Sequence, residues 1–242
     1  MARRCFFNPF SLLMIGFLFL VLLFLIPFLF LSIIGSAFAK LGFSAGTVFL
    51  ILIFTLVGSL VNIPLTTLKT GGPVRMEKTY SPFYGWVYRI PEVAPETTVA
   101  INLGGALIPL FISVYLLGRA LLIPGGTTVF FLALVGVLIV ALITHRVARP
   151  VPGLGIATPF FVPPLAALIV ALVLSLFVGG GEAAVIAAPV IAYISGTLGT
   201  LIGADLLNLR RLGELGAPMV SIGGAGTFDG VFLSGVLAAF LA

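Results

Sequence analysis

Two aspartates lie in otherwise apolar stretches near the C-terminal end of the chain. Asp205 occurs in GTLIGADLLNL and Asp229 in GGAGTFDGVFLSG, and no other charged residue lies between Asp229 and Ala242. Two carboxyl groups a few ångströms apart in a medium of low dielectric constant tend to share one proton. One of them then takes a proton from water while the other donates a proton to a peptide carbonyl. The two acids therefore predict an aspartyl hydrolase, with Asp205 and Asp229 as its catalytic residues.

Two other roles for these acids stay open. They could carry protons or cations through a small transporter or channel. They could also be structural, in a non-catalytic membrane scaffold. Asp205 lies five residues before Arg210 and six before Arg211, so it could pair with them, and Asp229 could cap the N-terminus of a helix.

The composition predicts an integral membrane protein of a prokaryotic-type cytoplasmic membrane, with membrane lipids as partners. Of the 242 residues, 61% are hydrophobic and 8% are charged, whereas a soluble domain has about a quarter charged residues. The basic residues form no groove with interleaved aromatic side chains, so we expect no nucleic acid as a partner. With one His and one Cys, we expect no metal site, no cofactor and no intrachain disulfide. The oligomeric state is not predicted.

Seven apolar stretches have the length needed to cross a bilayer, and they predict an all-α polytopic bundle that forms a single domain over residues 1–242. The stretches are 11–34, 45–66, 99–117, 127–144, 159–178, 183–205 and 225–242. Basic residues accumulate in cytoplasmic loops. With the N-terminus inside and the C-terminus outside, only Lys40 and Arg119 of the 12 Lys and Arg residues are external. The sixth span then descends and the seventh ascends, which gives Asp205 and Asp229 a similar depth near the cytoplasm.

Two segments between the spans are unusual. Residues 67–98 are expected to form a cytoplasmic polar loop, with a short hairpin at FYGWVYRI. Residues 146–158 are rich in Pro and Gly and predict either a surface loop or a re-entrant segment. In the second case the backbone must be buried in protein or line water. The candidates for a substrate cleft or a water path are Gly226, Gly230, Pro163, Pro164, Asn62 and Asn102.

Two similar segments each open a predicted outward span, namely NLGGALIPLFIS at 102–113 and SIGGAGTFDGVFLS at 221–234. Close packing of small residues in membranes produces such likeness without duplication. An internal repeat is therefore weakly indicated.

The segment GTFDGVFLSGVLAA at 226–239 resembles the seventh-span signature of presenilin and signal peptide peptidase, the GxGD intramembrane aspartyl proteases. The resemblance implies catalytic aspartates on the sixth and seventh spans and a single-span membrane peptide as substrate. Phe228 stands where that family has Gly, Ala204 stands where it has Tyr, seven spans replace nine, and no Pro-Ala-Leu follows. The segments ARPVPGLGI and GGAGTFDG also resemble a prokaryotic membrane-protein family of unknown function.

Overall fold

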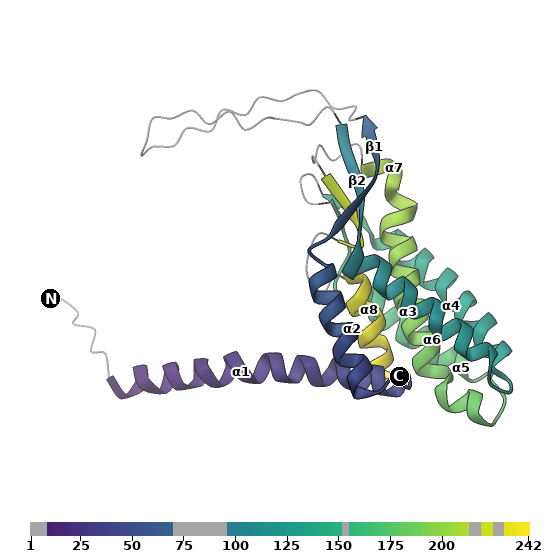
Figure 1. Ribbon diagram of the computed structural model, residues 1–242, viewed down its shortest axis with the longest axis horizontal. Coiled ribbons are helices and arrows are strands. Elements are labelled where there is room, and N and C mark those ends of the chain that lie inside the picture. The colour runs from purple at the N-terminus through teal and green to yellow at the C-terminus, as the bar shows by residue number, and fades with distance from the viewer. Residues whose placement is uncertain (1–8, 70–95, 152–154, 213–218, 225–229) are drawn as a thin grey trace.

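Helices make up most of the residues that the computed structural model describes, which are 9–69, 96–151, 155–212, 219–224 and 230–242 (Figure 1). The helices are α1 (Pro9–Lys40), α2 (Ala45–Gly58), α3 (Ile108–Leu121), α4 (Gly126–Val147), α5 (Val162–Ser175), α6 (Glu182–Thr200), α7 (Leu209–Leu212) and α8 (Gly230–Leu241). A π-helical turn, Leu103–Leu107, precedes α3, and a second, Leu201–Asp205, continues α6 into the 3-10 turn Leu206–Asn208.

Four of these helical segments are long and apolar enough to cross a membrane. They are Phe10–Lys40, Leu103–Leu121, Gly126–Val147 and Glu182–Asn208, while α2, α5 and α8 are shorter apolar helices. A mostly helical protein with the features of a membrane protein is therefore confirmed.

Helix α6 forms the centre of the bundle and packs against α3, α4, α5 and α8. In an apolar 18-residue stretch of the helical segment Glu182–Asn208, 72% of the residues are buried, against 6% in the corresponding stretch of α1. Glycines permit this packing, because a Cβ at Gly196 would lie 2.9 Å from the Ser234 carbonyl oxygen and one at Gly203 would meet the Ala141 carbonyl. Helices α6 and α8 run antiparallel, with Tyr193 and Thr197 of α6 against Gly235, and with Thr200, nearer the sheet end, against Ser234.

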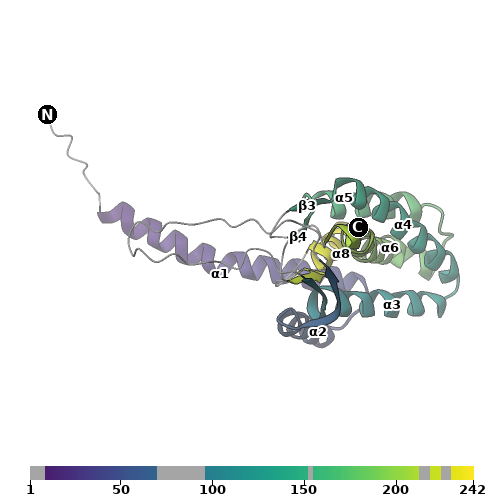
Figure 2. The same ribbon diagram turned by 90° about the horizontal axis from the view of Figure 1, so that it is seen from above.

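Helix α1 joins the bundle only through its C-terminal end (Figures 1 and 2). Ile34, Ala37 and Phe38 are fully buried there. The corner after α1 is held by Arg119, whose Nη1 donates to the Leu41 carbonyl at 2.8 Å. Most large apolar side chains of residues 10–31 are exposed, and the helix is apolar on every side. Such a surface requires lipid or another apolar partner around it.

Two small sheets adjoin one end of the bundle, where β1 and β2 extend beyond the helices (Figure 1). The first sheet has the order β1-β2-β5, with β1 (Asn62–Lys69) antiparallel to β2 (Glu96–Asn102) and β5 (Met219–Ile222) parallel to β2. The register pairs Asn62 with Asn102. The second sheet is a hairpin of β3 (Arg149–Val151) and β4 (Gly155–Ala157).

These strands correct the all-α prediction. The predicted span 45–66 stops as a helix at Gly58 and becomes strand β1, and the predicted span 99–117 begins inside strand β2. Pro64 has no N–H to continue a helix, and it is tolerated at an edge strand, where a register shift follows it. Strand β2 carries the β-branched residues Thr97, Thr98, Val99 and Ile101, which favour extended backbone.

The two predicted loops are also partly strand. Residues 67–69 and 96–98 belong to β1 and β2, and the hairpin predicted at FYGWVYRI lies outside the described residues. The segment 146–158 contains the end of α4 and the β3–β4 hairpin. Strand β4 contacts the π-helical turn that ends at Asp205.

Replacing Gly196 by Ala is expected to destabilise the contact between α6 and α8, because the added Cβ would lie against backbone atoms of Ser234 and Gly235. Overpacking of this kind costs about 1–3 kcal/mol, which lowers the thermal midpoint by several degrees. Thermal unfolding in detergent measures the effect. Gly46→Ala in α2 is the control, since no heavy atom lies within 4 Å of its Cβ position. Equal midpoints for the two variants would contradict the expectation.

Candidate functional site

Asn102 lies where β2 ends and the chain enters the π-helical turn before α3. Its side chain is fully buried. The Nδ2 group donates to the Ser59 carbonyl at 2.8 Å and to Oδ1 of Asn62 at 3.0 Å, while Oδ1 accepts from the Gly105 N–H at 2.7 Å. One amide therefore joins the end of α2, the start of β1 and the start of the next helix. It satisfies backbone groups that lipid cannot.

Asn62 extends this network to the third strand. Its Oδ1 atom accepts both from Asn102 and from the Ser221 hydroxyl, the latter at 2.6 Å. Ser221 lies in β5, two residues before Gly223. Side chains of β1, β2 and β5 thus meet at the end of the sheet that lies nearest the helices.

Two Gly-Gly pairs pack against each other beside this network. Gly223 and Gly224 have φ values of +79° and +78°, which favour glycine. A Cβ at Gly105 would meet the carbonyl oxygen of Gly223, and a Cβ at Gly223 would lie 2.6 Å from that of Ala106. The turn after β5 therefore sits directly on the turn after β2.

Asp205 is attached to the same turn. The Gly223 N–H donates to its Oδ2 atom at 2.7 Å. Asp205 ends the π-helical turn that continues α6, and its side chain is half-buried. A hydrogen bond from a backbone N–H to a carboxylate is charge-assisted, and it is stronger than one between neutral groups. The acid is therefore held at a fixed position against the turn that leads towards Asp229.

Asn208 stabilises the π-helical turn. It is a buried residue that the sequence analysis did not single out. Its Nδ2 group donates to the carbonyls of Gly203 at 3.1 Å and Ala204 at 2.9 Å, and it lies 3.2 Å from Nδ1 of His145. π-Helical turns of this kind occur frequently at functional sites. The only sequence signal for Asn208 was an amide at the end of an otherwise apolar span.

A column of buried hydroxyl groups runs along α6 towards Asp205. Tyr193, Thr197 and Thr200 lie on one face of α6 at helical spacing, and all are at most 2% exposed. The Thr200 hydroxyl lies 2.9 Å from that of Ser234 in α8, which also donates to the Gly196 carbonyl at 2.7 Å. Among the described residues, the hydroxyls of Tyr193 and Thr197 make no hydrogen bond of ordinary geometry. These residues were missed because single Ser and Thr residues are common in apolar spans.

The predicted site residues divide into three groups. Asn62 and Asn102 are in contact with each other, and Ser221 in β5 links them to the turn that binds Asp205. Pro163 and Pro164 are buried in the first turn of α5, a position that suits proline, and Gly230 is the exposed first residue of α8. Asp229 and Gly226 lie outside the described residues. Within the described part of the chain, no group of His, Cys, Asp and Glu is arranged to hold a metal ion.

Fold and site together define a mostly helical protein with four helices long and apolar enough to cross a membrane and a strand-to-helix junction at one end. Residues 56–241 match the family described as "Protein of unknown function (DUF1614)". Because the match covers more than half of the chain, the chain belongs to this family. The matched residues include Asp205, Asn62 and Asn102, and they leave out α1. No curated protein and no solved structure matches the chain.

Replacing Asn102 by Leu is expected to lower the free energy of unfolding by about 2–5 kcal/mol. The change leaves the buried Ser59 carbonyl and Gly105 N–H without their partner, and each unsatisfied group costs about 1–3 kcal/mol. Asn62→Leu is the matched control and should cost less, because Asn62 is half-buried and water can replace part of its contacts. Denaturant or thermal unfolding in detergent measures both variants. A larger loss for the Asn62 variant would show that Asn102 is not the centre of the junction.

Proposed function

We propose that the protein is an intramembrane aspartyl protease that uses Asp205 and Asp229 to hydrolyse peptide bonds of single-span membrane substrates. One contact carries the proposal: the N–H of Gly223, six residues before Asp229, donates to the carboxylate of Asp205 at 2.7 Å. The chain segment that leads from Gly223 to Asp229 therefore begins beside Asp205. The resemblance of residues 226–239 to the GxGD proteases supports the same pair.

The register of α6 and α8 supports a common level for the two acids. The hydroxyls of Thr200 and Ser234 are 2.9 Å apart. Thr200 lies five residues before Asp205, and Ser234 lies five residues after Asp229. These equal separations along the chain support the proposed pairing of the two acids. Asp229 itself precedes α8 and lies outside the described residues.

The chemistry needs only these two acids and a water molecule. One carboxylate accepts a proton from the water as the water oxygen bonds to the peptide carbonyl carbon, and the protonated acid gives its proton to the carbonyl oxygen. The resulting diol then breaks its C–N bond as the first acid returns a proton to the amine nitrogen and the second carboxylate takes a proton from a diol hydroxyl. The products are a carboxylic acid and an amine, and the pair of acids again holds one proton. The bond from Gly223 keeps Asp205 in place during these transfers.

The charges of the described residues support a cytoplasmic position for the sheet end of the bundle. Lys69, Arg146, Arg149 and Arg211 lie at the end of the bundle that carries the sheets and Asp205, whereas Lys40 and Arg119 lie at the other end. The positive-inside rule assigns the first end to the cytoplasm. Both acids then lie near the cytoplasmic surface, where water can reach them.

Purified protein is expected to cleave a single-span peptide in detergent or liposomes, and Asp205→Asn and Asp229→Asn should each lower the rate at least about 100-fold, as expected for loss of an acid–base group. Mass spectrometry of the products measures cleavage. Glu182→Gln is the matched control, because Glu182 is an exposed acid at the far end of α6 and should leave the rate unchanged. Cleavage that persists in either aspartate variant would refute the proposed dyad.

The column of hydroxyls favours a second candidate function, the movement of protons or cations. Tyr193, Thr197 and Thr200 lie along α6 between its middle and Asp205, and the Thr200 hydroxyl is hydrogen-bonded to that of Ser234. The hydroxyls of Tyr193 and Thr197 would join a proton path through bridging water molecules. Broken helices beside such a path are typical of transporters. On this second proposal Asp205 is the cytoplasmic end of the path.

Proton flux into liposomes tests this candidate. Reconstituted protein should acidify the lumen faster than empty liposomes do, and Thr200→Val, which keeps the side-chain shape and removes the hydroxyl, should slow this several-fold. Asp205→Asn should abolish it. Thr47→Val is the control, since Thr47 lies at the far end of α2, where its hydroxyl bonds to Ser44. Flux equal to that of empty liposomes would exclude this function.

A further inference from the structure

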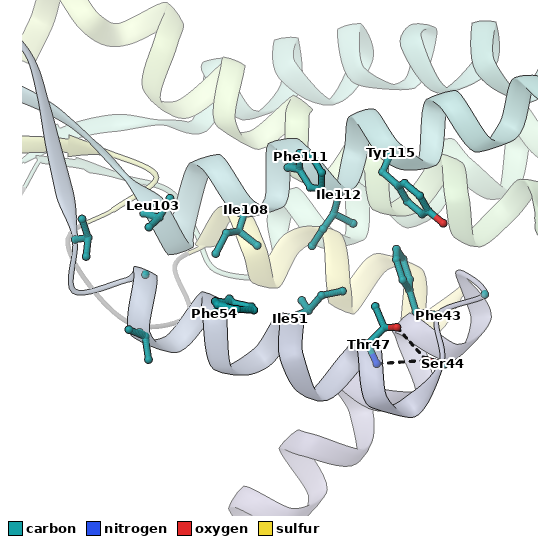
Figure 3. Close-up of a pocket in the computed structure, with 14 residues that line it drawn as sticks. Phe43, Ser44, Thr47, Ile51, Phe54, Leu103, Ile108, Phe111, Ile112 and Tyr115 are labelled. Carbon is teal, nitrogen blue, oxygen red and sulfur yellow. Dashed lines mark hydrogen bonds between the residues drawn. The ribbon is translucent and has the colours of Figure 1, made fainter.

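A lateral groove of about 760 Å³ lies between α2 and α3 (Figure 3). Ile51 and Phe54 of α2 face Ile108 and Ile112 of α3 across it. These walls are apolar. The polar side chains of the groove, including Ser44, gather at the end away from the sheets.

The chain segments that carry α2 and α3 meet at both ends of the groove. At the sheet end Gly58 packs on Gly104, since a Cβ at Gly58 would lie 3.1 Å from the Gly104 nitrogen. At the other end the rings of Phe43 and Tyr115 lie 5.5 Å apart. Between these contacts the side chains leave the groove unfilled. The groove opens sideways, where the lipid would be.

A cation lies at the polar end of the groove. Arg119 is one helical turn after Tyr115, and its Nη1 atom donates to the carbonyls of Leu41 at 2.8 Å and Gly42 at 3.4 Å. Gly42 itself lines the groove. The guanidinium is half-exposed and has five N–H donors. Within the described residues no carboxylate pairs with it, so donors remain for an anionic ligand.

We propose that this groove binds an acyl chain of an anionic phospholipid, with the lipid phosphate on Arg119. Arginine recognises phosphate through paired N–H donors, and the hydroxyls of Ser44 and Thr47 are near enough to the mouth to bind headgroup oxygens. Helix α2, with 14 residues, is about 21 Å long, which exceeds the roughly 15 Å of one leaflet's hydrocarbon. One chain can therefore lie along the groove while its phosphate reaches Arg119.

The cation at the polar end favours a phospholipid over an apolar polypeptide helix as the occupant. An apolar helix offers no anion to Arg119, whereas a phospholipid offers both an apolar chain and a phosphate. An acyl chain is narrower and can follow the uneven wall formed by Ile51 and Ile112.

Native mass spectrometry of the full chain tests the proposal, with equal amounts of phosphatidylglycerol and phosphatidylcholine that carry the same acyl chains. The wild-type protein is expected to retain phosphatidylglycerol about tenfold better, as for one charge-assisted contact. Arg119→Gln should reduce this ratio to about one, while its amide can still donate to the Leu41 carbonyl. Arg119→Lys should keep part of the preference.

A second pair of variants tests the groove independently of the charge. Ile51→Trp fills the groove and should remove retention of both lipids, whereas Leu138→Trp, at an exposed apolar position of α4, should change neither. Glycerol 3-phosphate, which has the charge without the chain, should not bind measurably. Equal retention of the two lipids by the wild-type protein would overturn the proposal. So would lipid retention by Ile51→Trp, or binding of glycerol 3-phosphate as tight as that of the lipid.

Discussion

The structure depends on one constraint, which is that an apolar chain must satisfy its own backbone wherever it leaves the helical conformation. Lipid offers no hydrogen bonds, so each free N–H or C=O needs a partner within the protein. Here the chain changes from helix to strand after Gly58 and from strand to helix at Asn102. The buried amide of Asn102 supplies partners on both sides of this change. The proposed catalytic chemistry lies at this junction because it is the place where polar groups are already required.

The two Gly-Gly segments have equivalent positions at the junction. NLGGA begins at the last residue of β2 and leads into α3, whereas SIGGA begins within β5, the parallel neighbour of β2, and precedes α8. Asn102 and Ser221, the first residues of the two segments, both donate to Oδ1 of Asn62. The similarity of the segments therefore reflects a shared local role, namely a strand end that turns towards a helix in a crowded space.

The sequence predicted the helices well and the strands poorly, for a physical reason. Hydropathy measures how apolar a segment is, and strand residues such as Ile63, Val99 and Ile101 are as apolar as helix residues. The relevant signals were local: Pro64 and the run of β-branched residues around Thr97. At the site, Asn62 and Asn102 were identifiable because amides are rare in apolar spans. Their pairing arises from the β1–β2 register, and the contact between Gly223 and Asp205 arises from tertiary packing, which no spacing along the chain encodes.

The proposed lipid groove and the junction beside the proposed catalytic site are in direct contact at Leu103 and Val61. Leu103 lines the sheet end of the groove, and its N–H donates to the Val61 carbonyl at 3.0 Å. These residues directly adjoin Asn102 and Asn62, whose side chains hold the junction together. A chain bound between α2 and α3 would hold the two helices at a fixed separation, and the junction joins those same two helices. Since close-packed groups transmit small displacements, occupation of the groove is expected to affect the position of the strands that lead to Gly223 and Asp205.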